Sequence, residues 1–210
     1  MYSGTITGAG DGVRLDNTGT NAKFTMSGGT ISNNGGRGVL VQGGTFEMSG
    51  GEISGNTAGT NGGGVYVVSG TFTMEGGTIS GNKATGGSNS CGGGVFVGNQ
   101  GIFNMSGTAK ISDNTADTDG GGVFVDSGTT FTVSGTPTIT DNNNIRNGSN
   151  VTNNVHLYNN TITIGRGGLT LTEDAKIGVT VDSQSPNVPT DEKPVDITKG
   201  ADKDYSSYFK

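Results

Sequence analysis

The 210-residue chain contains one cysteine, Cys91, and one histidine, His156. A single cysteine excludes an internal disulfide framework and a zinc site built from cysteines. Only 12 basic residues stand against 18 acidic ones, which gives a net charge of −6, and no basic cluster occurs in the sequence. We therefore expect no nucleic-acid partner, because nothing in the chain would neutralise a phosphate backbone.

Long apolar runs are also missing. No stretch approaches the ~18 apolar residues of a membrane-spanning helix, so we expect no membrane insertion within this chain. No signal peptide stands at Met1 and the repeats have begun by Thr5, which favours a piece of a longer exported protein over a complete cytosolic one. Leu, Ile, Val and Phe together supply only a fifth of the residues. Such a composition lies near the boundary of disorder, but the few apolar residues recur at fixed spacing.

The recurring residues define a repeated unit. Its regular copies are GRGVLVQGGTFEMSGGEISGN (36–56), GGGVYVVSGTFTMEGGTISGN (62–82), GGGVFVGNQGIFNMSGTAKISDN (92–114) and GGGVFVDSGTTFTVSGTPTITDN (120–142), after a degraded copy at 1–19. Each copy holds three apolar tracks, Val-x-Val, Phe-x-Met and a lone Ile before an Asn, and none is long enough for a helix. Such a unit buries a continuous core only when copies stack along one axis. We predict an all-β fold, a single-stranded right-handed parallel β-helix of six to seven coils with three short strands each.

Strand alternation predicts which side chains face outward. The flanks of the first track stay apolar, whereas its middle position runs from Arg14 to His156 along the chain. A dry core would not accept an arginine, so the middle residues face outward and the flanking valines inward. The middle position of the second track is polar in every copy, which sends its Phe and Met inward as well. With the lone Ile, each regular copy therefore has five predicted inward positions, such as Val65, Val67, Phe72, Met74 and Ile79. The apolar members of this outward row are Leu40, Tyr66, Phe96 and Phe124. We expect them to form an exposed strip, either a ladder of stacked side chains or a face that binds a glycan or a protein.

An asparagine closes the third track of each copy. These residues are Asn34, Asn56, Asn82, Asn114 and Asn142. Asparagine tolerates the left-handed conformation and its amide can bond along a stack, so we interpret the series as a structural ladder. The interval from the first Val of a copy to this asparagine is nearly constant, at 17 or 19 residues, whereas the interval from the asparagine to the next such Val varies from 5 to 13. The loops there, including 83–90 beside Cys91, should therefore line one edge, where solenoids usually bind their partners.

The repeats place the β-helix at residues 1–181, with Ile6, Val13 and Leu15 as the inward set of its first coil. We expect an Asn-rich loop within 143–160, after which Val155 and Leu157 resume the first track, and further strands at 161–164, 169–171 and 176–181. Three of the four prolines fall in 182–194, which predicts a loop or linker. Residues 195–210 read as the start of another β element.

The repeat corner and the C-terminal segment also resemble known families of bacterial surface proteins. The GGGV-aromatic-V corner with Ile-Ser-Gly-Asn-x-Ala is similar to the GGA-I and F-x-x-N repeats of polymorphic outer-membrane proteins, with Ile where that family has Phe. The ending NNTITIGRGGLTLTEDAKIGVTV, followed by DITKG and YSSYF, resembles a segment of glycine-rich surface proteins of gut Firmicutes. The chain thus resembles the pectin-lyase-like β-helix regions of large bacterial surface proteins and adhesins.

This resemblance implies a non-enzymatic structural or adhesive segment at the extracellular surface. Its partners would be a glycan or a host or cell-surface protein, and further domains would flank it in the same chain. The same coil also carries pectin lyases and phage tailspikes, so a polysaccharide lyase or hydrolase is the alternative.

Such an enzyme would need a calcium cluster with a basic residue, or paired carboxylates, aligned across coils. The four arginines occupy unrelated coil positions, and Glu47 stands between Thr25 and Thr73 at the equivalent positions. We therefore predict no catalytic residue, metal or cofactor. A hydroxyl-rich ice-binding face is disfavoured too, because Glu52 and Lys110 interrupt the row of Thr and Ser residues beside the inward Ile.

The densest acidic set is Asp113, Asp117 and Asp119. It has the oxygen ligands that calcium prefers, but the equivalent positions of other copies are not acidic, which favours a solvated loop. His156 continues the outward row and belongs to no recognisable metal-binding or catalytic motif in the sequence, so we expect it to fill surface. Cys91 falls in a variable loop and reads as an incidental free thiol.

Overall fold

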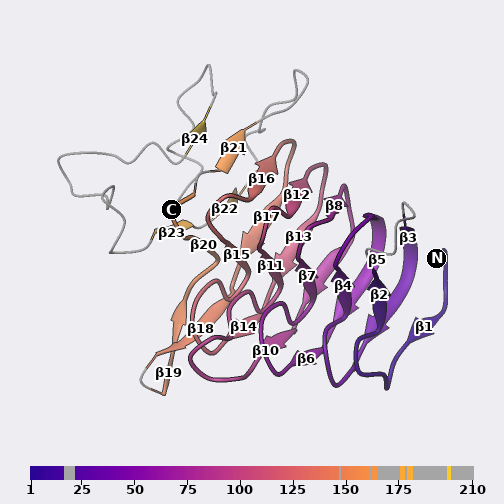
Figure 1. Ribbon diagram of the computed structural model, residues 1–210, viewed down its shortest axis with the longest axis horizontal. Coiled ribbons are helices and arrows are strands. Elements are labelled where there is room, and N and C mark those ends of the chain that lie inside the picture. Colours follow the sequence, from indigo (N-terminus) through magenta and orange to yellow (C-terminus); the bar gives the residue numbers. More distant parts are fainter. Residues whose placement is uncertain are drawn as a thin grey trace.

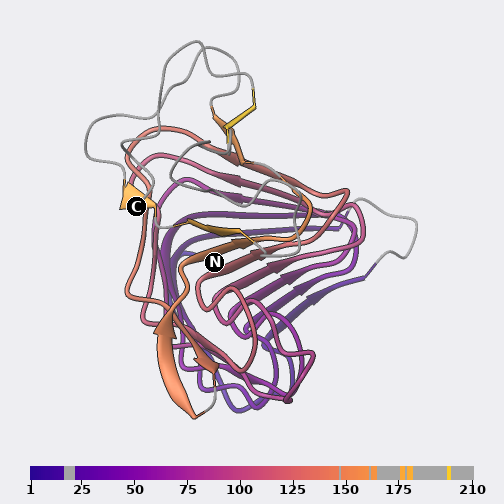
Figure 2. The same ribbon diagram turned by 90° about the vertical axis from the view of Figure 1, so that its left-hand side faces the viewer.

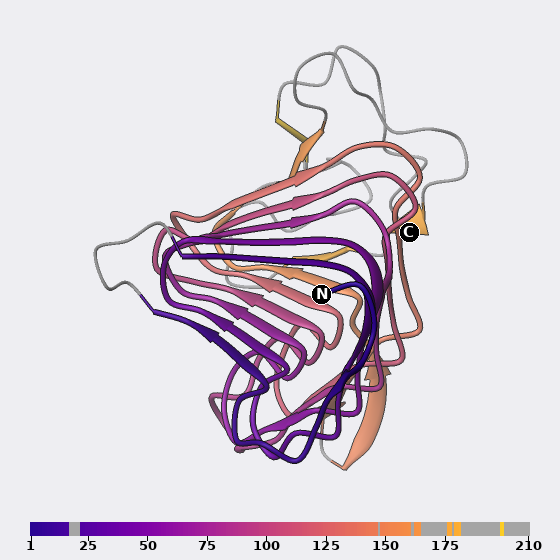
Figure 3. The ribbon, with the colours of Figure 1, turned by 90° about the vertical axis from the view of Figure 1, so that its right-hand side faces the viewer.

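The computed structural model describes residues 1–16, 22–146, 148–160, 162–164, 176–177, 179–181 and 198–199. These residues form stacked parallel strands without any helix, which confirms the predicted all-β parallel β-helix. Successive coils follow one another along the long axis, from the indigo N-terminal end to the orange strands (Figure 1). Viewed from the N-terminal end, the coils lie behind one another with a similar outline (Figure 3). In this described part, no helix is long and apolar enough to cross a membrane.

The Val-x-Val tracks form a seven-stranded parallel sheet, here called the valine sheet. Its strands are β2 (Val13–Leu15), β4 (Val39–Val41), β7 (Val65–Val67), β11 (Val95–Val97), β15 (Val123–Val125), β20 (Val155–Leu157) and β23 (Val179–Val181). Each strand pairs with its counterpart one coil away, so that Val65 lies between Val39 and Val95. Identical residues therefore stack along the axis.

The Phe-x-Met and Ile tracks share one twelve-stranded sheet, here called the long sheet. The second track supplies β3 (Lys23–Ser32), β5 (Thr45–Ser54), β8 (Thr71–Met74), β12 (Ile102–Met105), β16 (Thr130–Val133), β21 (Ile162–Ile164) and β24 (Thr198–Lys199). The third supplies β1 (Thr5–Ile6), β9 (Thr78–Ser80), β13 (Lys110–Ser112), β17 (Thr138–Thr140) and β22 (Lys176–Ile177). In β3 and β5 both tracks run through one strand of 10 residues, whose pairing shifts register on each side of Ser27. The expected division into separate strands therefore holds only for later coils.

A five-stranded sheet after the corner asparagine was missed from the sequence. Its strands are β6 (Thr57–Ala58), β10 (Lys83–Ala84), β14 (Thr115–Ala116), β18 (Asn143–Arg146) and β19 (Ser149–Thr152). Ala58, Ala84 and Ala116 are buried, so the alanine two residues after the asparagine is a further inward position of the coil. Small size hid it, because alanine alone gives a weak apolar signal.

The expected Asn-rich loop at 143–160 is wrong for its first half. Strands β18 and β19 pair antiparallel, while β18 also continues the parallel pairing from Thr115 and Ala116. The resulting hairpin extends away from the stacked coils (Figures 1 and 2). Backbone pairing to the preceding coil, rather than residue type, makes this Asn-rich stretch a strand.

About five turns of the solenoid are complete, fewer than the six to seven expected. The degraded first copy supplies only β1 and β2, and the turn that follows β20 includes residues outside the described ranges. The predicted strand at 169–171, the linker at 182–194 and most of the element at 195–210 also lie outside the described residues.

The five inward positions predicted for each regular coil are all buried. In the coil from β7 to β9 they are Val65, Val67, Phe72, Met74 and Ile79, each 0 % exposed. The second-track phenylalanine rings stack from coil to coil, with centroids 4.8 Å apart for the Phe46 pair with Phe72 and 4.9 Å for Phe72 with Phe103. In the first coil Leu15 is buried, whereas Ile6 and Val13 are only partly buried against the core.

The Gly-Gly-Gly runs before β7, β11 and β15 allow neighbouring coils to approach closely. In the third run, Gly120 has a φ of 63°, which favours glycine. A Cβ added to Gly121 would lie 2.1 Å from the carbonyl oxygen of Asn143, and one added to Gly122 would lie 2.4 Å from that of Asn154. Gly120 therefore supplies a backbone conformation that other residues rarely adopt, whereas Gly121 and Gly122 leave room for the backbone of the next coil.

Candidate functional site

The corner asparagines form one hydrogen-bonded column inside the solenoid. Their side-chain donor and acceptor distances (Nδ2 to Oδ1) are 2.8 Å for Asn34 to Asn56, 2.8 Å for Asn56 to Asn82, 3.0 Å for Asn82 to Asn114 and 2.9 Å for Asn114 to Asn142. All five are buried. Each Oδ1 from Asn56 onward also accepts a bond from the backbone N–H of the preceding member. The column thus satisfies buried donors that would otherwise be unpaired.

Two features of this column were not visible in the repeat. Asn142 donates onward to Asn154, 3.0 Å away, although Asn154 occupies the backbone position of Gly122 in the next coil. The left-handed conformation belongs to the residue before each column member, such as Asp113 and Asp141, both at φ 60°. The column asparagines themselves do not take up this conformation, so the hydrogen bonds of their amides, and not their tolerance of a positive φ, account for the series.

The outward row of the valine sheet is in register from coil to coil. Each member of the row pairs with its counterpart one coil away, in the order Arg14, Leu40, Tyr66, Phe96, Phe124 and His156. The expected exposed strip is nevertheless wrong, because Leu40, Phe96 and Phe124 are only 4, 6 and 8 % exposed. Only Tyr66 among the four apolar members is half-buried.

Stacking within the row accounts for much of this burial. The rings of Phe96 and Phe124 lie 5.2 Å apart with 2° between their planes, and His156 stacks on Phe124 at 5.1 Å. Tyr66 meets Phe96 edge-on at 5.0 Å, while the guanidinium of Arg37 lies 5.1 Å from the Tyr66 ring centre. The ring faces are therefore covered by one another, which leaves little of them open to a ligand.

Variable loops complete a hollow against this row, here called the loop groove. It is a shallow, open depression of about 290 Å³, lined by Asn61, Ser88, Asn89, Cys91, Phe96, Phe124, Asp126 and Tyr158. Phe96 and Phe124 come from the valine sheet, whereas the other lining residues lie in the connections before and after its strands. The groove therefore combines residues from four consecutive coils: Asn61, Ser88, Asn89 and Cys91 lie on the edge where the repeat length varies, whereas Asp126 and Tyr158 lie just after the valine-sheet strands.

Hydrogen bonds between coils hold the walls of the loop groove. The Asn61 Oδ1 accepts from the backbone N–H of Cys91 at 2.9 Å, and the Asp117 carboxylate accepts from the Gly87 N–H at 3.0 Å. On the opposite side, the Asn160 amide donates to the Asp126 carbonyl oxygen at 2.6 Å. These bonds tie the variable loops to the neighbouring coils.

Cys91 is a free, half-buried thiol whose Sγ lies 3.0 Å from the Thr118 hydroxyl. Burial raises the pKa of this thiol, and the hydrogen bond with Thr118 offsets only part of the effect. The group is therefore mainly protonated at neutral pH, which disfavours a nucleophilic role.

The candidate calcium residues are not brought together. Asp113 is exposed at its left-handed turn, Asp117 accepts from Gly87, and Asp119 lies against His156 with 3.6 Å between Oδ1 and Nδ1. Within the described residues, no three His, Cys, Asp or Glu side chains are arranged to hold a metal ion. His156 is 4 % exposed, so the expectation that it fills surface is wrong.

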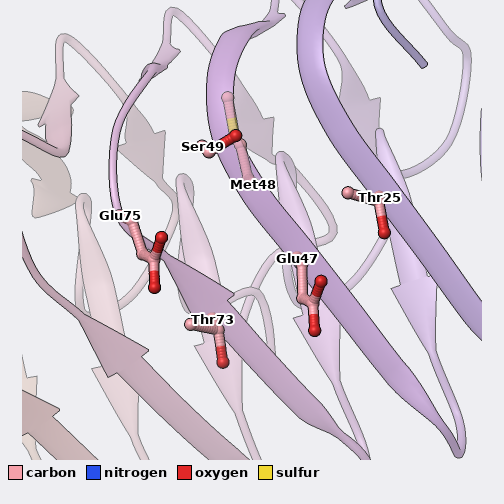
Figure 4. Close-up of a pocket in the computed structure, with 6 residues that line it drawn as sticks. All are labelled: Thr25, Glu47, Met48, Ser49, Thr73 and Glu75. Carbon is pink, nitrogen blue, oxygen red and sulfur yellow. The ribbon is translucent and has the colours of Figure 1, made fainter.

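A second hollow lies on the long sheet and is here called the acidic hollow. It encloses about 240 Å³ and is lined by Thr25, Glu47, Met48, Ser49, Thr73 and Glu75. Figure 4 shows Glu47 and Glu75 on neighbouring coils with Thr73 between them. Lys23 already pairs with Glu47 at 2.8 Å. Sequence reasoning missed this grouping because it compared only equivalent coil positions, whereas Glu75 follows the end of β8.

Comparison of the chain with protein-family models, with curated proteins and with solved structures finds no match.

Proposed function

We propose that this chain is a non-enzymatic structural and adhesive segment of an extracellular bacterial surface protein. In this role the solenoid is a stiff rod, and its loop edge presents a binding face. The observation that carries the proposal is the pair of internal columns, one of stacked phenylalanines and one of hydrogen-bonded asparagines, that run through the regular coils. The inward residues barely change between copies, while the loops at one corner vary in length. This division favours a constant scaffold with an adaptable edge.

Mechanical stiffness is the property that a spacer requires. We expect the chain, pulled from both termini by force spectroscopy, to resist extension and then to unfold in steps of about one coil. An Asn82→Ala variant should yield at lower force because it interrupts the asparagine column, whereas Asn150→Ala on the exposed hairpin strand should not. Extension at low force without steps would contradict the proposal.

A polysaccharide lyase or hydrolase is the second candidate, and the acidic hollow is what favours it. Two carboxylates and several hydroxyls around one hollow resemble the general layout of glycosidase sites. The test is a screen for reducing sugars and unsaturated products on pectins, alginates and host glycans. Turnover that is lost in Glu47→Gln and in Glu75→Gln, but kept in Glu52→Gln outside the hollow, would replace the structural proposal with this one.

A further inference from the structure

The loop groove presents one accessible aromatic side chain above a fixed floor. Tyr158 is 42 % exposed, and its ring centre lies 6.4 Å from that of Phe124. Phe124 is itself held between Phe96 and His156, at 5.2 and 5.1 Å. A tyrosine on such a support offers apolar contact area with little conformational entropy to lose on binding.

The rim of the loop groove is polar, and hydrogen bonds orient some of its side chains. Asn61 and Asn89 contribute amides, Ser88 a hydroxyl and Asp126 a carboxylate. Backbone N–H groups already bond one oxygen of Asn61 and one of Asp126, at 2.9 and 2.8 Å, which orients both side chains. Because amides and hydroxyls both donate and accept, this rim suits a ligand rich in hydroxyl groups.

Charge and size narrow the class of ligand. Among the described residues that line the groove, Asp126 alone carries a charge, and the chain as a whole has a net charge of −6. A carboxylated, sulfated or phosphorylated ligand would therefore meet repulsion without a basic partner. The volume of about 290 Å³ lies near the lower end for small-ligand pockets. A stable protein interface would instead need about 800 Å² from each partner.

From these observations we infer that the loop groove binds a neutral oligosaccharide. The inference rests on the adhesive role proposed above and names its ligand class. A pyranose ring places its flat C–H face on Tyr158, while its hydroxyl groups bond the amides and the carboxylate of the rim. The buried row of Phe96 and Phe124 supports this contact from below instead of forming it.

The test is titration of the intact chain with neutral oligosaccharides of glucose, mannose and galactose, and with an oligogalacturonate as the acidic probe, followed by amide NMR shifts. We expect at least one neutral probe to move the signals of Ser88, Asn89 and Tyr158, and the acidic probe to move none. Tyr158→Ala should weaken binding about tenfold, equivalent to ~1.4 kcal/mol. Tyr2→Ala is the matched control, because Tyr2 is 88 % exposed and lies outside the groove.

Asn89→Ala provides a second variant at an exposed loop position and should also reduce affinity. The inference is overturned if no neutral probe binds, if only the acidic probe binds, or if Tyr158→Ala and Asn89→Ala bind as tightly as the unmodified chain. Binding of a protein in place of sugars at these same residues would overturn it as well. None of these results affects the stiffness and turnover tests of the proposed function. A failure of the binding inference can therefore be told apart from a failure of the proposed function.

Discussion

Replacement of Asn82 tests the energetic role of the asparagine column. Asn82 is 0 % exposed, and its Nδ2 donates to the carbonyl oxygens of Ile53 and Ser80 and to the Asn114 Oδ1, at 2.9, 3.1 and 3.0 Å. Its Oδ1 accepts from the backbone N–H and the Nδ2 of Asn56, at 3.1 and 2.8 Å. One side chain therefore satisfies both donors and acceptors in three coils.

Asn82→Ala leaves the buried Asn56 backbone N–H without this acceptor. An unpaired buried donor costs about 1–3 kcal/mol, and with the small cavity we expect a loss of about 2–4 kcal/mol in the free energy of unfolding. Asn82→Asp keeps the shape of the side chain and its acceptor oxygen. Its second carboxylate oxygen replaces Nδ2, however, and therefore faces the oxygens of Ile53, Ser80 and Asn114. The change also buries a negative charge. We expect this isosteric change to be worse than alanine by about 1–2 kcal/mol.

Equilibrium unfolding in urea, followed by circular dichroism, measures these differences, and hydrogen exchange of the Asn56 amide reports the loss locally. Asn150→Asp, on the exposed strand β19, controls for the chemistry of the change and should leave stability within about 0.5 kcal/mol. If Asn82→Asp proves as stable as the unmodified chain, or more stable than Asn82→Ala, the donor role of the Asn82 amide is refuted.

Three further experiments test the buried core, the glycine-rich corner of the coil and the Cys91 thiol. Ile79→Asp, at a 0 % exposed position, should lower the free energy of unfolding by more than about 4 kcal/mol, while Thr78→Asp on the outward side should have a small effect in the same urea experiment. Gly121→Ala should destabilise by about 1–3 kcal/mol because its Cβ meets a backbone oxygen, whereas Gly10→Ala has open space and should melt with the unmodified chain in calorimetry. Cys91 should react with a thiol-specific disulfide reagent more slowly at neutral pH than a model thiol, and should accelerate as pH rises, because burial raises its pKa. A rate equal to that of the model thiol at neutral pH would contradict this last expectation.

The interior of this protein was predictable from its sequence because repetition and strand alternation act together. When identical units stack in register, the same residue recurs at the same place on the axis, so inward positions show little variation. Val65, Phe72 and Ile79 were assigned inward on this ground, and all are 0 % exposed. The column from Asn34 to Asn142 was visible for the same reason, since each member precedes the next by one coil.

Strand alternation could not predict whether an outward-facing side chain is exposed to solvent. Phe96 and Phe124 face outward from the valine sheet, yet neighbouring rings and loops from adjacent coils cover them. The loops that build the groove differ in length from copy to copy, so their paths carry no periodic signal. Glu47 and Glu75 likewise line one hollow from neighbouring coils, at positions that do not correspond. Local alternation determined the direction of each side chain, whereas only the packing of non-equivalent loops in three dimensions decided its exposure, its neighbours and the location of the candidate binding site.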